Sequence, residues 1–233
     1  MNADVTNPLK IGWAAAKANV VPMVVLWALA AATVLSYYFV PGVAAALEPL
    51  LRWQTESGWV AAFLNRVFFC GLLPGAFLLS IKSIRPKRPL ATIAAQTLWC
   101  GLWGVAFDFY FRGLDVVFGP GHDAATLFAK MAADEFAITP LLAAPADAVF
   151  FFWLGRDFSF ARARADWPRA FYRELVAPNL VSNWCVWVPV GLAVFAFPLP
   201  LQIQVSGFAA AFWTLACLQI GARTARREKG KSS

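Results

Sequence analysis

The organisation of this chain is visible in residues 58–88, which read GWVAAFLNRVFFCGLLPGAFLLSI followed directly by KSIRPKR. The first part is a mainly apolar run, and an α-helix needs about 20 apolar residues to cross the roughly 30 Å of hydrocarbon in a bilayer. The second part is strongly basic, and short basic loops stay on the cytoplasmic side of a membrane or its equivalent. The stretch therefore predicts a membrane span whose end is marked by positive charge.

The same unit recurs, because apolar runs and basic segments alternate along the chain. The six apolar runs lie at about 18–41, 58–81, 90–111, 127–154, 174–197 and 202–222. Most of the 20 Lys and Arg residues fall in four segments, which are the start of the chain with Lys10 and Lys17, Lys82 to Arg88, Arg156 to Arg173, and the tail from Arg223. The remaining connections carry only Arg52 and Arg112. A soluble fold has no physical reason to sort charge in this way.

This alternation predicts an all-α integral membrane protein, a bundle of about six transmembrane helices with both ends on the side of the basic loops. We expect a lead at 1–17, one transmembrane bundle at 18–222 and a basic polar tail at 223–233. A surface helix is expected near Leu47–Trp53. The spacing of Gly71 and Gly75 predicts a close contact between helices, used either inside the bundle or for docking a partner.

Composition supports lipid as the solvent and argues against nucleic acid as a partner. The chain is 60% hydrophobic and 14% charged, whereas an ordinary soluble domain carries roughly 25% charged residues. The net charge of +7 flanks the apolar runs and forms no continuous basic face. We interpret it as a topology signal that also attracts anionic lipid.

The sequence does not favour an enzyme, and no cofactor or metal is expected. The four Cys residues all fall inside predicted spans without a CxxC pair, so buried thiols are the simplest interpretation. His122 is the single His, and it lies in a Gly-Pro-Gly-His-Asp stretch typical of a turn. No HExxH, GxSxG or P-loop pattern accompanies it.

Polar residues inside the predicted spans are the candidates for function, because ionisable groups at membrane depth are costly. One band lies in the half away from the basic loops and contains Asn65, Arg66, Asp108, Lys130, Asp134 and Glu135. A second band lies in the other half and contains Gln96, Asp147, Asn179, Asn183 and Gln219. Two interpretations stay open: a hydrated path through the bundle, or hydrogen bonds and ion pairs that only join helices. Arg66 is expected to reach toward the nearer interface.

Spacing predicts two ion pairs within single helices. Lys130 and Asp134 are four residues apart and share a helix face, as do Asp108 and Arg112. Asp147 has no basic residue one turn away on its own helix. It is therefore either protonated, hydrated or paired with another helix.

Several motifs in the second half of the chain occur in a recognisable order. Gly104 to Asp115 reads GVAFDFYFRGLD, and Lys130-Met-Ala-Ala-Asp134-Glu135 is followed by Pro140. Asn183-Trp184-Cys-Val-Trp187 comes later, with Trp213 beyond it. Over about residues 90–222 the chain resembles the Mpv-seventeen and twenty-two-kilodalton peroxisomal membrane protein family. It departs from that pattern with Asp108 at a His position and Glu135 at a Gln position.

The resemblance implies an integral protein of the peroxisomal or inner mitochondrial membrane, and some members of the family are described as channels for small solutes or cations. We therefore expect a channel or pore, with the lipid bilayer and small solutes or ions as partners and a homo-oligomer left open. A structural or homeostatic protein that docks partners without transport is the alternative. The candidate pore or polar-network residues are Asp108, Lys130, Asp134, Glu135, Asp147, Asn183, Trp184 and Trp187. Asp134 and Glu135 are expected near one mouth, and Asp147 with Asn183 toward the other, since carboxylates favour cations.

Overall fold

The structure is a computed structural model that describes residues 13, 17, 20–81 and 85–229, with side chains as far as residue 214. Apart from Trp13 and Lys17, the predicted lead at 1–17 lies outside the described residues, as do the last four residues of the predicted tail. Within the described part, the chain is helical and contains no strand. Its helices are α2 (Val20–Phe39), α3 (Val43–Ser57), α4 (Trp59–Arg66), α5 (Leu73–Ser80), α6 (Pro89–Phe118), α7 (Ala124–Ala133), α8 (Ala144–Leu154), α9 (Phe160–Ala165), α10 (Ala177–Phe195) and α11 (Leu199–Lys229).

Five helical stretches are long and apolar enough to cross a membrane. They are Val20–Phe39, Trp59–Ser80, Pro89–Phe118, Ala124–Leu154 and Tyr172–Phe195. Three of them contain a π-helical segment, at Val67–Leu72, Asp134–Ala143 and Tyr172–Val176. The prediction of an all-α membrane bundle is confirmed, and the surface helix expected near Leu47–Trp53 is part of α3.

The sixth predicted span, 202–222, belongs to α11 and is not among these five. α11 is one continuous helix of 31 residues, but its side chains from residue 215 onward lie outside the described part. The sixth span therefore stays a prediction. Because α11 continues to Lys229, the first residues of the predicted basic tail are helical.

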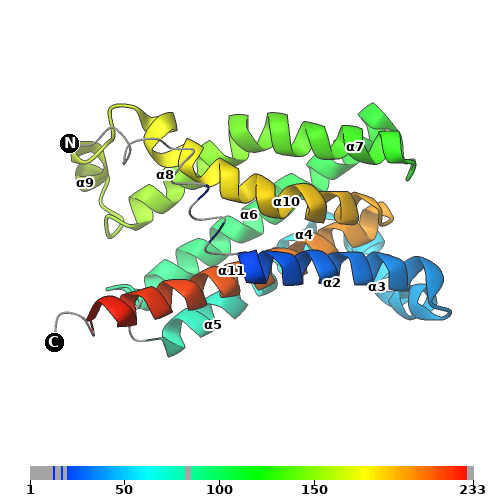
Figure 1. The fold of residues 1–233 in the computed structure, drawn as a ribbon, viewed down its shortest axis with the longest axis horizontal. Helices are drawn as coiled ribbons and strands as arrows, with labels where there is room; N and C mark the ends of the chain where they lie inside the picture. Colours follow the sequence, from blue (N-terminus) through cyan, green and yellow to red (C-terminus); the bar gives the residue numbers. More distant parts are fainter. Residues whose placement is uncertain (1–12, 14–16, 18–19, 82–84, 230–233) are drawn as a thin grey trace.

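The helices run mainly along the long axis of the molecule, and basic and weakly basic connections lie at opposite ends (Figure 1). α9, which carries Arg162 and Arg164, lies at the left end of the view together with the C-terminal end of α11. α3, the helix of the weakly basic 42–57 connection, lies at the right end. This arrangement agrees with the alternation of basic and weakly basic connections in the sequence.

The core forms where α2, α10 and α11 pack together. Leu26, Val186, Val190 and Ile203 are each 1% exposed or less. Large apolar side chains also cover the outside of the bundle, and Val116 is 87% exposed. In lipid this outer surface is solvated, so close packing and interhelical hydrogen bonds, rather than removal of apolar area from water, stabilise the bundle.

The Gly71-xxx-Gly75 face is used inside the bundle. A Cβ atom at Gly71 would lie 2.7 Å from the Cα atom of Thr97, and one at Gly75 would lie 2.6 Å from a methyl group of Ile93. Both distances are shorter than van der Waals contact. The glycines therefore allow the second span to approach α6 closely, which is the internal use of the motif.

Candidate functional site

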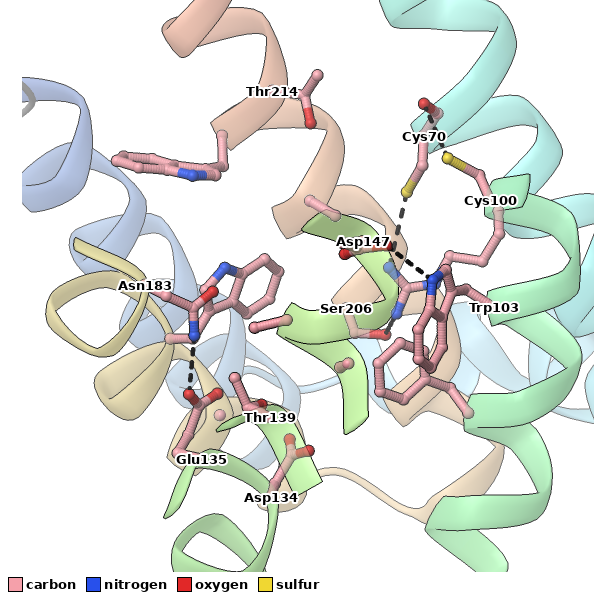
Figure 2. A pocket seen from close by; sticks show the side chains of 18 of the residues that line it. Cys70, Cys100, Trp103, Asp134, Glu135, Thr139, Asp147, Asn183, Ser206 and Thr214 are labelled. Carbon is pink, nitrogen blue, oxygen red and sulfur yellow. Dashed lines mark hydrogen bonds between the residues drawn. The ribbon is translucent and has the colours of Figure 1, made fainter. Parts of the chain in front are cut away.

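A cavity of about 580 Å³ lies between the membrane-spanning helices. Its wall is partly aromatic and contains three carboxylates, Asp134, Glu135 and Asp147, with Arg66 as the described cation. Figure 2 shows Asp147 beside Trp103 on one side of this cavity, and Glu135 beside Asn183 on another. Asn183 and Trp187 also line it, so five of the eight sequence candidates meet there.

Asp147 is held by two tryptophans of α6. The indole nitrogens of Trp99 and Trp103 donate to its Oδ1 atom at 2.7 Å and 2.9 Å. The two indoles are four residues apart and so lie on one face of α6. Trp99 also stacks on Phe150, with 4.5 Å between ring centroids. Of the three states considered from the sequence, the structure supports hydrogen bonding to another helix.

Glu135 is bound from α10 through both its side chain and its backbone. The amide nitrogen of Asn183 donates to Glu135 Oε2 at 3.0 Å, and the Trp184 indole donates to the Glu135 carbonyl oxygen at 2.7 Å. In a π-helix the N–H group five residues later would satisfy that carbonyl. Residue 140 is a proline and has no N–H group. The Trp184 indole therefore replaces a hydrogen bond that the backbone cannot make.

A second carbonyl group of the π-helical segment, five residues further along, is also bound by a side chain in place of a backbone N–H group. Pro145 lacks the N–H group that would reach the carbonyl oxygen of Pro140 in the π register. The Tyr172 hydroxyl donates to that oxygen instead, at 3.2 Å. Side chains near and within α10 thus cap the carbonyl groups that two prolines leave free, and this keeps the wider helix stable beside the cavity.

Two sequence predictions about this wall are wrong. Lys130 does not pair with Asp134, because its ammonium group lies 2.5 Å from Asp115 Oδ1 at the far end of α6. Asn183 contacts Glu135 rather than accompanying Asp147 at the opposite mouth. Lys130 is 1% exposed and faces α6, so its ammonium group reaches Asp115 on that helix. Asp134 instead borders the cavity.

The predicted pair of Asp108 and Arg112 is confirmed, but it lies apart from the cavity. The guanidinium Nε lies 3.0 Å from Asp108 Oδ2. Asp108 also accepts a long hydrogen bond of 3.5 Å from Gln54 of α3. Asp108, Lys130 and Trp184 are thus the three sequence candidates that do not line the cavity wall.

A buried amide network joins α3, α4 and α11. Gln204 donates to Gln54 at 2.6 Å and accepts from Asn65 at 2.5 Å. Gln54 lies on α3. Asn65 directly precedes Arg66 on α4, and Gln204 lies two residues before Ser206 on α11; Arg66 and Ser206 both line the cavity. The network joins three helices, and its three residues are not among those that line the cavity.

Sequence reasoning misjudged one part of the site and did not find another. Arg66 was named among the polar residues of the spans, but its side chain is buried, at 7% exposed, and its guanidinium donates to Ser206 Oγ at 2.8 Å. The tryptophans that hold Asp147 were not singled out. The available signal was the four-residue spacing of Trp99 and Trp103, which places both indoles on one face of a predicted span. Asp147, which has no basic partner on its own helix, needed hydrogen-bond donors from another span.

Among the described residues, no group of three or more His, Cys, Asp or Glu side chains is arranged to hold a metal ion. Comparison of the chain with models of protein families, with curated proteins and with solved structures finds no match. The resemblance stated above therefore stays a prediction.

Proposed function

We propose that this protein is a passage through which small polar solutes or ions cross a membrane, with the cavity as the binding section of that passage. The observation that carries the proposal is the wall of three carboxylates inside a bundle of membrane-spanning helices. Placing ionisable groups at membrane depth is costly, and such groups mark the routes of solutes and ions in membrane proteins.

The free oxygen atoms of this wall support a binding role beyond joining helices. The Asp134 side chain lines the cavity and makes no hydrogen bond or ion pair with the described residues. Asp147 and Glu135 each use one carboxylate oxygen for interhelical hydrogen bonds. Their second oxygens accept none from the described side chains, so they remain available to a solute or to water.

A buried amide network joins helices that lie beside the cavity. Gln54, Asn65 and Gln204 are all less than 10% exposed and bind one another directly. Opening toward α3 would require these hydrogen bonds to break. We infer that the network is the constriction of the passage and that α3 moves when it opens.

Reconstitution in planar bilayers tests the proposal, with size-graded solutes and a protein-free control. We expect ionic currents that increase with the amount of protein. Under a KCl gradient, the reversal potential of Asp134→Asn should indicate a weaker preference for cations than that of the wild type. Asp166→Asn is the matched control, because Asp166 lies on the surface at α9 with a side chain that is 57% exposed. Tight bilayers with folded protein would refute the passage and favour the docking alternative.

The resemblance also leads us to propose a peroxisomal or inner mitochondrial membrane as the location. Fractionation of cells that produce the native chain tests this, and recovery in another membrane would refute it.

A further inference from the structure

Arg66 is a buried cation on the cavity wall that the proposed function does not yet use. Its side chain is bound by neutral partners: Nη2 donates to Ser206 Oγ at 2.8 Å, and Nη1 lies 3.6 Å from Cys70 Sγ. Its Nε atom is buried and has no hydrogen-bond partner among the described residues. The guanidinium therefore keeps donor capacity, although the residue is only 7% exposed.

No described carboxylate forms a direct ion pair with this guanidinium, although Asp134 of the same cavity wall lies near enough to act on it at longer range. On the neighbouring helix α6, Asp108 is bound to Arg112 and Asp115 is bound to Lys130. No described carboxylate lies within the 4.0 Å of an ion pair with Arg66. A buried charge without a partner is destabilising, so this site favours an incoming anionic group that binds the guanidinium.

The same wall offers acceptors for a cationic group close by. The centre of the Arg66 guanidinium lies 5.1 Å from the ring of Phe107, and Trp103 donates to Asp147. Phe107 and Trp103 are four residues apart on α6, which corresponds to about 6 Å along a helix. The guanidinium and the Asp147 carboxylate are thus held by aromatic side chains about one helical turn apart.

We infer that the solute of this cavity is a small zwitterion, whose anionic group binds Arg66 and whose ammonium group binds the free oxygen of Asp147. This inference rests on the proposed function. A solute with only positive charge would leave Arg66 without a counter-ion, and a solute with only negative charge would meet three carboxylates. The cavity of about 580 Å³ is of a size typical of small-molecule sites.

Fluxes through the wild-type chain test the inference with three labelled probes of similar size. Taurine carries an ammonium and a sulfonate group, isethionate has a hydroxyl in place of the ammonium, and choline carries a cation alone. In proteoliposomes, we expect the taurine flux to exceed the other two by about tenfold, the effect of one charge-assisted hydrogen bond. Choline or isethionate flux equal to that of taurine would overturn the inference and leave the proposed passage intact.

A matched pair of variants tests the role of the guanidinium. Arg66→Gln is expected to lower the taurine flux about tenfold, to the level of isethionate. Arg52→Gln makes the same chemical change on the surface of α3, where the Arg52 side chain is 70% exposed, and should leave the flux unchanged. Helix content and elution volume in detergent establish that each variant is folded. A folded Arg66→Gln protein with full taurine flux would contradict the proposal.

Binding separates this inference from a failure of transport. If none of the probes crosses faster than in protein-free liposomes, the proposed function fails. The inference then requires that taurine raise the melting temperature of the wild-type protein in detergent more than isethionate or choline does. Equal shifts would refute it. Because this measurement uses the wild-type chain, it also decides the matter if Arg66→Gln does not fold.

Discussion

The hydrogen bond between Trp184 and the backbone of Glu135 gives a prediction that can be tested in two halves, by removing the indole N–H and by restoring the missing backbone N–H. Trp184→Phe keeps an aromatic ring against Phe136, whose ring centroid lies 5.6 Å away, but removes the indole N–H. The Glu135 carbonyl then has no donor, because residue 140 is a proline. A buried polar group left unpaired costs about 1–3 kcal/mol, and hydrogen bonds measured within membranes average about 0.6 kcal/mol. We therefore expect Trp184→Phe to lower the free energy of unfolding by about 1 kcal/mol.

The second half of the test restores the missing backbone donor. Pro140→Ala supplies an N–H group that can reach the Glu135 carbonyl in the π register. In that background, the cost of Trp184→Phe should be smaller than in the wild type by about 0.5 kcal/mol or more. Unfolding in mixed micelles with increasing sodium dodecyl sulfate measures all four proteins of this cycle. Trp59→Phe is the control, because Trp59 is 53% exposed on the apolar surface. If the two substitutions have strictly additive effects, the proposed replacement of the proline N–H by the indole is refuted.

Three other substitutions have defined consequences. Gly71→Val should lower the free energy of unfolding by about 1–3 kcal/mol in the same micelle titration, since its side chain would overlap the backbone at Thr97. Lys130→Met should cost about 3–5 kcal/mol because it leaves the Asp115 carboxylate without its cation, and Asp115→Asn in the same chain should recover part of the loss. Asp123→Ala should lower the melting temperature at neutral pH, because Asp123 caps α7, and the difference from wild type should vanish in acid.

The pH dependence at Asp123 follows from the hydrogen bonds of its carboxylate. The hydroxyl and N–H of Thr126 donate to it at 2.6 Å and 3.1 Å, and they hold its pKa below the ordinary value. A lowered pKa in the folded state stabilises the protein above the unfolded pKa, and the contribution is lost as the pH falls through the folded pKa. Thermal melts of both proteins across this range measure it. A difference that grows on acidification would contradict the assignment.

For the other two substitutions, the contrary results are equally direct. A Gly71→Val protein as stable as wild type would mean that the second span and α6 do not approach closely. A double variant at Lys130 and Asp115 that is no more stable than Lys130→Met alone would mean that the ion pair is not what the single change disrupts.

The sequence predicted an all-α membrane bundle because the information for membrane-spanning helices is local in the sequence. An apolar run such as 58–81 and the basic turn after it can be read without knowing any neighbour. The pair of Asp108 and Arg112 was predicted for the same reason, since helix spacing alone brings them together. The prediction for Lys130 and Asp134 was wrong because an equally plausible partner, Asp115, lay on another helix. Spacing within one helix contains no information about such a competitor.

The cavity could be predicted only in part. Asp134, Glu135 and Asp147 stood out because carboxylates are rare in apolar runs. Arg66 was expected at the interface, because a long cation usually reaches water when water is near. Its buried position depends on Ser206, which lies 140 residues further along the chain. The π-helical segment beside the cavity could not be predicted either. A proline in a sequence shows that one backbone hydrogen bond is missing, but not which side chain replaces it.

The length of α6 has a consequence for the kind of bilayer that suits this protein. Its 30 residues correspond to about 45 Å, well beyond the roughly 30 Å of an average hydrocarbon layer. An upright α6 would thus extend past the acyl chains near Asp108, so the ion pairs of Asp108 with Arg112 and of Asp115 with Lys130 would lie at the level of the headgroups. A thicker, sterol-rich bilayer would draw these pairs into hydrocarbon, and hydrophobic mismatch would then have to be relieved by thinning of the lipid around the helix. We therefore expect the chain to suit a membrane of average or less than average thickness.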